Sequence, residues 1–211
     1  LPDPVYGTGA DGDVTISTNT TLTADKNYKN LTVNGGITLN PGGYRIFVQN
    51  VLTLGASAIV GFATGFTTAG TLAQGGATNT AVTNSLGGSS GAQTATVPTA
   101  ALGGSLYYQQ PLQAIQGWAV TAASTTPTFL KGGAGGASGA GGGVVLIAAR
   151  YITVVSGTAS FSAPGTPGAG GGGGGVILIV SSASTLNAGV TTDVTGGTGA
   201  SAGTVNYMQV A

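Results

Sequence analysis

The sequence contains no cysteine, no histidine and no glutamate, and only five basic and five acidic residues stand among its 211. Charged residues make up 5% of the chain, against about 25% in an ordinary globular domain. Catalysis by a thiolate or an imidazole is excluded, as are zinc sites built from Cys and His. Since an acid–base pair would have to come from aspartate, tyrosine or lysine, we expect a protein that is not an enzyme and that needs no cofactor.

The few charges balance, because the formal net charge is zero and the pI is about 6.1. Binding to a nucleic acid or an anionic bilayer requires a clustered excess of Lys and Arg, so neither partner is expected. A net charge near zero also removes the repulsion that keeps small domains apart. Without disulfides, oligomerisation is the remaining source of rigidity. We therefore expect a homo-oligomer, either a trimer or a helical assembly.

Long apolar runs are also missing. Residues 46–130 carry no charge, yet Gly, Thr, Asn and Gln interrupt every apolar stretch well before the roughly 18 residues that suggest a membrane span. We expect no membrane insertion. The chain begins at Leu1 instead of Met, which favours a processed or exported protein.

Helix-forming patterns are nearly absent, because the 41 glycines interrupt almost every stretch of the chain and glycine disfavours helices. A short alternating pattern is present instead, in which two apolar residues that share one face of a strand stand on either side of one outward-pointing residue. It recurs at 14–16, 31–33, 37–39, 46–48, 52–54 and 58–60. The intervening Asn34-Gly35-Gly36, Asn40-Pro41-Gly42-Gly43 and Gly55-Ala56-Ser57 are typical of turns. The sequence therefore predicts an all-β protein.

Strands this short and regular favour a β-solenoid of parallel β-helix type, whose levels lie about 4.8 Å apart and bury a continuous aliphatic column. A meander of hairpins that forms a β-sandwich or barrel is the alternative. Composition divides the chain into three regions. These are a short-strand β region at 1–60, an uncharged connector rich in Gly, Thr and Ala with an aromatic segment at 61–130, and a glycine-rich β region with two repeats at 131–211.

The third region contains an internal repeat. Residues 142–147 return as 174–179 at a shift of 32, and residues 161–163 match 194–196 at a shift of 33, which indicates stacked units. The apolar runs within this repeat lack alternation, so both faces of those strands are expected to be buried. One face can pack internally, and the other needs a neighbouring subunit or the glycine-rich segments.

Glycine tracts at 132–143 and 170–175 are either flexible linkers or ordered segments. Ordered glycine chains adopt an extended threefold helix of the polyproline II type, which has no internal hydrogen bonds. Because they carry no side chains, such helices can lie side by side and bond to one another. The tracts adjoin the apolar strands directly, so we expect packed, polyglycine II-like segments.

Several segments resemble, in order, glycine-rich proteins encoded by tailed bacteriophages: 11–16, 19–22, 28–33, 43–48, 113–117 and 141–150. The resemblance implies a protein of the virion surface, such as a tail fibre, tail tip, receptor-binding or head-decoration protein, in contact with other virion proteins. Related glycine-rich repeats occur in bacterial surface adhesins. A secreted bacterial or archaeal cell-surface adhesin or filament subunit is therefore the alternative.

Few acidic residues qualify as functional sites. Asp11 and Asp13 are a weak metal candidate, because a calcium ion takes about six to eight oxygen ligands, and a turn into the first strand explains them better. Asp25 and Lys26 are expected to form a solvated surface pair. No metal site is therefore predicted.

Aromatic residues gather between 105 and 130, where Tyr107, Tyr108, Trp118 and Phe129 lie among glutamines. Aromatic faces beside amides can stack on sugars, and Tyr and Trp are frequent in interfaces. These residues are candidates for host recognition through a cell-surface polysaccharide. A subunit contact, or a cap on the open end of the hydrophobic column, is the alternative.

Overall fold

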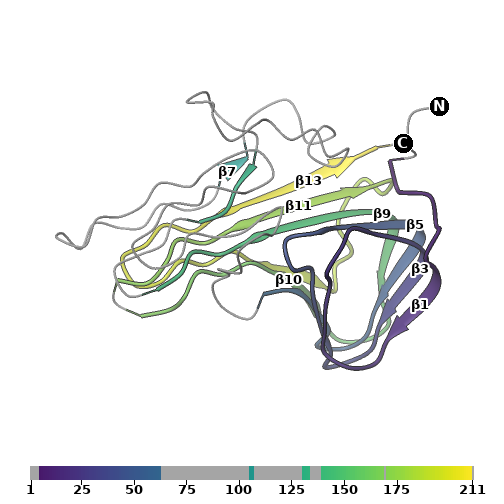
Figure 1. The fold of residues 1–211 in the computed structure, drawn as a ribbon, viewed down its shortest axis with the longest axis horizontal. Coiled ribbons are helices and arrows are strands. Elements are labelled where there is room, and N and C mark those ends of the chain that lie inside the picture. Colours follow the sequence, from purple (N-terminus) through teal and green to yellow (C-terminus); the bar gives the residue numbers. More distant parts are fainter. Residues whose placement is uncertain (1–4, 63–104, 107–129, 134–138, 169, 211) are drawn as a thin grey trace.

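The computed structural model describes residues 5–62, 105–106, 130–133, 139–168 and 170–210. Every regular element among them is a β-strand (Figure 1), so the all-β prediction is confirmed. Sheet A comprises β1 (Gly12–Ile16), β3 (Lys26–Val33), β5 (Arg45–Leu54), β9 (Val144–Val154), β11 (Val176–Ser181) and β13 (Thr204–Gln209). Sheet B comprises β2 (Thr20–Thr21), β4 (Thr38–Asn40), β6 (Ile59–Gly61), β10 (Ala159–Ser162) and β12 (Val190–Asp193). A separate antiparallel pair joins β7 (Ser105–Leu106) to β8 (Leu130–Lys131).

The chain alternates between sheets A and B, with β7 and β8 inserted after β6. Neighbouring strands within each sheet are parallel, and each new strand takes the next position along its sheet. A meander of hairpins is therefore wrong for these two sheets, because hairpins join antiparallel strands. No helix long and apolar enough to span a membrane occurs in the described parts of the chain.

Residues in register stack their side chains between the sheets. In sheet A, Leu31 lies opposite Leu52, and in sheet B, Leu39, Val60 and Phe161 form one row. These side chains are at most 1% exposed and belong to one hydrophobic core. Since burial of one such side chain contributes about 2 kcal/mol, the rows hold the two sheets together.

Sheet A has longer strands than the sequence pattern predicted. Segments 46–48 and 52–54 belong to one strand, β5, whose register shifts between Val48 and Val51. Strand β3 already begins at Lys26, and its register also shifts before Leu31. The intervening residues are β-bulges, which bend a strand without ending it.

The predicted turns are present. The amides of Ile37, Tyr44 and Ala58 donate to the carbonyl oxygens three residues earlier, at Asn34, Pro41 and Gly55, over 3.2, 2.9 and 3.1 Å. The first and third of these turns each carry the chain from sheet A to sheet B. The same turn chemistry therefore recurs where β3 leads to β4 and where β5 leads to β6.

Strands that precede the connector pair directly with strands that follow it. Strand β5 pairs with β9, so that Leu54 lies opposite Val154, and β6 pairs with β10, so that Val60 lies opposite Phe161. One hydrophobic core therefore contains strands from both 1–60 and 131–211.

The internal repeat is confirmed in sheet A and corrected in sheet B. Val144 lies opposite Val176, at the predicted shift of 32. Phe161 lies opposite Thr192 instead of Val194, so the shift in sheet B is 31 and the predicted 33 is wrong. The two alignments differ by two residues, and residues two apart in a strand share a face, so the face pattern did not distinguish them.

Residues 144–149 of β9 and all of β11 are buried, so the two apolar runs are covered on both faces, as predicted, whereas the second half of β9 is partly exposed. The inner side chains join the core between the sheets. The outer side chains form a second apolar cluster with Tyr6 and the partly buried Phe47 and Met208. Residues of the same chain therefore take part in covering a face for which a neighbouring subunit or the glycine-rich segments had been expected.

Glycine-rich segments extend from the strands of both sheets, and we call each sheet together with its glycine-rich extension a layer. We call the described parts of 132–143, 163–175 and 194–203 the glycine-rich region; in Figure 1 its segments lie to the left of β9, β11 and β13. Among segments that enter sheet A, Gly142 N–H donates to Gly173 O (2.8 Å) and Gly174 N–H to Ser201 O (3.0 Å).

Other hydrogen bonds of this region join the two layers directly. Gly175 N–H donates to Ala163 O (2.7 Å), and Gly203 N–H donates to Val194 O (2.7 Å). Their acceptors lie on segments that leave sheet B, whereas their donors enter sheet A. The described glycine tracts are therefore packed segments and not linkers.

Candidate functional site

The N-terminal segment, residues 5–11, crosses the outer face of sheet A from its last strand to its first. In Figure 1 it runs from beside the C-terminus down to β1. Gly7 packs so closely on β5 that a Cβ there would lie 2.5 Å from Phe47 Cβ, and its φ is +80°. Glycine permits both the backbone conformation and the close approach.

Tyr6 attaches this crossing segment to the other end of the chain. Its hydroxyl donates to Val210 O at 2.5 Å, just beyond β13. The Arg150 guanidinium lies 5.7 Å from the centre of the Tyr6 ring, a cation–π contact. Burial raises the pKa of the Tyr6 phenol, an effect that Arg150 partly offsets. The sequence pattern did not identify Tyr6, because no local signal connects it with Val210.

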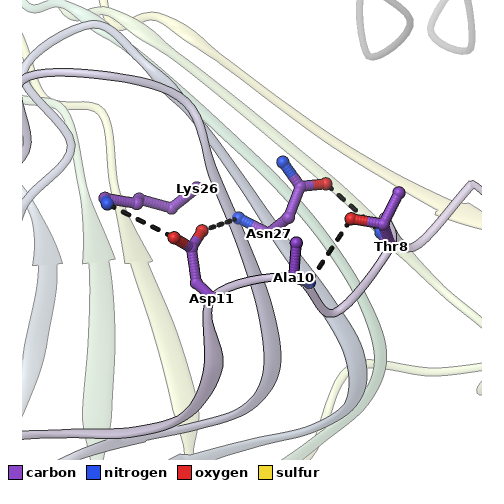
Figure 2. Close-up of polar contacts among 5 residues, drawn as sticks. All are labelled: Thr8, Ala10, Asp11, Lys26 and Asn27. Carbon is purple, nitrogen blue, oxygen red and sulfur yellow. Dashed lines mark hydrogen bonds and ion pairs between the residues drawn. The ribbon is translucent and has the colours of Figure 1, made fainter.

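Asp11 ends the crossing segment and binds the start of β3 (Figure 2). Its Oδ2 accepts a hydrogen bond from Asn27 N–H at 2.6 Å, and its Oδ1 lies 3.5 Å from Lys26 Nζ. Burial, and secondarily the Asp11 carboxylate, raises the pKa of the nearby Tyr28 to about 12. The contacts of Asp11 are those of a structural anchor.

Asp11 also lies in the predicted turn, because Gly12 N–H donates to Gly9 O at 3.0 Å. The second candidate, Asp13, accepts a hydrogen bond from Asn30 Nδ2 at 2.8 Å. In the parts of the chain that the structure describes, no three His, Cys, Asp or Glu side chains gather as metal ligands would. These two carboxylates form hydrogen bonds that join the crossing segment and β1 to β3.

The predicted surface pair of Asp25 with Lys26 is wrong. Asp25 instead binds Arg45, whose backbone N–H and Nε donate at 2.8 and 2.7 Å and whose Nη2 is also in contact. Lys26 binds Asp11. Neighbours in a strand point to opposite sides, so partners on the adjacent strand and on the crossing segment replace the sequence neighbour.

The sequence pattern did not predict that two side chains at the end of β9 are exposed. Tyr151 is 51% exposed and Val155 is 72% exposed. Both follow the long apolar run of β9, which by itself predicts burial. Tyr151 lies opposite Val51, just after the register shift of β5.

The aromatic candidates Tyr107, Tyr108, Trp118 and Phe129 lie outside the described residues. Their role in host recognition, in a subunit contact or as a cap stays a prediction. In the described part of the chain, the candidate functional features are the crossing segment, the glycine-rich region and the outer face of sheet A.

Comparison with models of known protein families, with curated proteins and with solved structures found no match to this chain.

Proposed function

We propose that this chain is a non-enzymatic structural protein of a bacteriophage virion exterior, serving in a tail fibre or tip, in receptor binding or in capsid decoration. It self-assembles on the virion surface, and its partners are copies of itself, other virion proteins and host surface glycans. Support for the virion comes from the resemblance of segments such as 11–16 and 141–150 to glycine-rich phage proteins. Support for a structural role comes from the architecture.

The proposed architecture is a β-solenoid of parallel β-helix type. It is supported by the alternation of the chain between two parallel sheets and by in-register aliphatic rows such as Leu31 opposite Leu52. A stack of this kind grows in one direction and transmits load along backbone hydrogen bonds. Such a shape suits a fibre or a spike.

The observation that carries the proposal is the backbone-to-backbone bonding of the glycine-rich region. Gly175 to Ala163 and Gly203 to Val194 join the layers at 2.7 Å each, without side chains between them. We infer a polyglycine II-like packing of these segments. Paired and buried backbone resists proteases, which act on exposed, unpaired segments, and this resistance suits a particle surface.

Self-association is supported by the ends of the sheets. Among the described strands, β1 and β13 lie at the edges of sheet A, and β2 and β12 lie at those of sheet B. Edge strands offer backbone groups that pair with another chain. With a net charge of zero, little repulsion opposes such pairing.

Electron microscopy of the native source material, with the protein located by mass spectrometry of the same particles, tests the virion proposal. Tailed particles that carry the protein are the expected result, and its position separates a fibre from a decoration protein. Long filaments free of capsids would overturn the proposal in favour of the cell-surface filament or adhesin.

Self-association is tested by sedimentation of Val205→Lys, which places a charge on edge strand β13, where Val205 is 39% exposed. The variant is expected to shift the protein to smaller species, because edge charges oppose strand pairing. Val155→Lys, at a more exposed site away from this edge, is the matched control. Equal sedimentation of both variants and the wild type would show that β13 does not mediate assembly.

A further inference from the structure

A row of threonines crosses the outer face of sheet A. Thr15 lies opposite Thr32, Thr32 opposite Thr53, and Thr53 opposite Thr153. The residues on either side of each threonine pack into the core, so the threonines point outward. We call these residues, on β1, β3, β5 and β9, the threonine row.

The hydroxyls of the threonine row have no hydrogen-bond partner among the described residues, in contrast to the hydroxyls of Ser162 and Thr191, which donate to backbone carbonyls. Thr15 and Thr153 are exposed, and Thr32 and Thr53 are half-buried. Neighbouring strands hold successive hydroxyls about 4.8 Å apart. The row therefore presents regularly spaced donors and acceptors on a rigid surface.

Exposed apolar side chains adjoin the same row at one end. Tyr151 and Val155 enclose Thr153 along the chain and share its face, and they are 51% and 72% exposed. The third large exposed apolar residue of the described chain is Val205, on the far edge of sheet A. An exposed phenol ring beside free hydroxyls is an observation independent of the row itself.

We propose that the threonine row and Tyr151 bind an uncharged, extended polysaccharide laid across the strands. Tyr151 stacks on a sugar ring, and the threonine hydroxyls bond to successive sugars, because the strand spacing is close to the length of one residue in an extended β-linked glycan. This site deepens the glycan contact of the proposed function and rests on it. It differs from the aromatic candidates predicted from the sequence.

The charges around the row favour a neutral ligand. The carboxylate beside it, Asp13, accepts a hydrogen bond from Asn30 Nδ2 at 2.8 Å. Among the described cations of β3, β5 and β9, Lys26 and Arg45 bind carboxylates and Arg150 lies over the Tyr6 ring, which leaves Lys29, beside Gly9 of the crossing segment. An anionic glycan that follows the row would need several unpaired cations, whereas a protein partner would need an apolar centre, which a row of hydroxyls does not provide.

Calorimetric titration of the purified protein with cellohexaose, chitohexaose, laminarihexaose and mannohexaose tests the proposal. At least one of these neutral oligosaccharides is expected to bind, and Tyr151→Ala should weaken that binding about tenfold or more. Thr53→Val, which keeps the shape of the side chain, should weaken it about threefold to tenfold. The distant Val205→Ala, on edge strand β13, should bind as the wild type does.

Absence of binding to all four oligosaccharides would overturn the proposal. So would binding by Tyr151→Ala and Thr53→Val that is as tight as binding by the wild type. Ice shaping by a protein that binds none of them would assign the hydroxyl row to ice instead. Thermal melts of each variant separate lost binding from lost folding. The titration does not depend on where the protein resides, so its failure is distinguishable from the failure of the virion proposal.

Discussion

The two halves of the molecule hold the same two layers together by different means. In residues 12–62, side chains such as Leu31 and Leu39, both 0% exposed, fill the space between the sheets. In the glycine-rich region, Gly175 and Gly203 bond across the layers directly through their backbones. The hydrophobic effect dominates the first part, whereas the second part depends on hydrogen bonds and on the absence of side chains.

The number of residues between paired positions of neighbouring strands differs in the same way. Leu31 lies opposite Leu52, 21 residues later, whereas Leu146 lies opposite Leu178, 32 residues later. The extra residues between β9 and β11 are glycine-rich and extend past the end of the aliphatic core. The path from one strand of sheet A to the next can therefore be lengthened without a larger apolar core, provided that the added residues are small enough for the layers to touch.

Replacing Gly174 by Ala should have the largest effect and would break the glycine-rich region. The added Cβ would lie 1.8 Å from Val194 O, which forces the layers apart. We expect the free energy of unfolding, measured with urea, to fall by about 4 kcal/mol or more. Gly199→Ala is the control, because φ is +79° there but no atom lies within 4 Å of the new Cβ, and it should cost about 1 kcal/mol. Equal losses in the two variants would contradict the close packing of the layers.

Leucine-to-alanine substitutions compare the core between the sheets with the outer apolar cluster. Leu31 and Leu178 are each 0% exposed, one in each cluster. Because both are buried, each substitution should lower the free energy of unfolding by about 3 kcal/mol. A much smaller loss for Leu178→Ala at concentrations where the chain is monomeric would show that the outer face depends on another subunit.

Alkaline titration sharpens the comparison from the side of the short-strand region. Burial raises the pKa of Tyr28 from 10.0 to about 12. Below pH 10 the Tyr28 phenol is protonated in both the folded and the unfolded state, so its contribution to stability is fully present. Above pH 10 the unfolded chain ionises first, so stability should fall by about 2 kcal/mol by pH 12. Urea unfolding from pH 9 to pH 12 should show a shallower decline in Tyr28→Phe, and an unchanged decline would exclude Tyr28 as its cause.

Tyr6→Phe tests the link between the two halves and should have the smallest effect. The substitution removes the 2.5 Å hydrogen bond to Val210 O, which should cost about 1 kcal/mol. Tyr44→Phe is the matched control, since the Tyr44 hydroxyl has no hydrogen-bond partner in the described part of the chain, and it should stay within about 0.5 kcal/mol. Thermal unfolding of both variants measures the difference. A loss in Tyr44→Phe equal to that in Tyr6→Phe would show that the hydrogen bond from Tyr6 to Val210 adds no stability of its own.

Local chemistry was readable from the sequence in several places. The turns at 34–37, 41–44 and 55–58 followed from Gly, Asn and Pro, whose backbone preferences act within a few residues. The strands followed from alternation, but the bulges at 49–50 did not, because an alternating pattern resumes on the far side of a bulge. The repeat at 32 residues was visible because the same apolar string returns.

Most of the candidate site was not readable in this way. Asp25 was assigned to its sequence neighbour Lys26 but binds Arg45 across the strands. Thr15, Thr32, Thr53 and Thr153 are unremarked single residues in the sequence, and only the register of four strands sets them in a row. Contacts between distant residues depend on register, which no local pattern specifies completely.

The sequence by itself determined the all-β class, the turns and the near absence of charge, because each depends on residue type or on neighbours a few positions away. It also determined that glycine tracts adjoin apolar strands. Only the tertiary structure decided that strands separated by the connector, such as β5 and β9, pair directly. It also decided that the N-terminal segment crosses sheet A to reach Val210. These are choices among pairings of similar local energy, and they are settled by how completely the whole chain buries its apolar side chains and pairs its backbone.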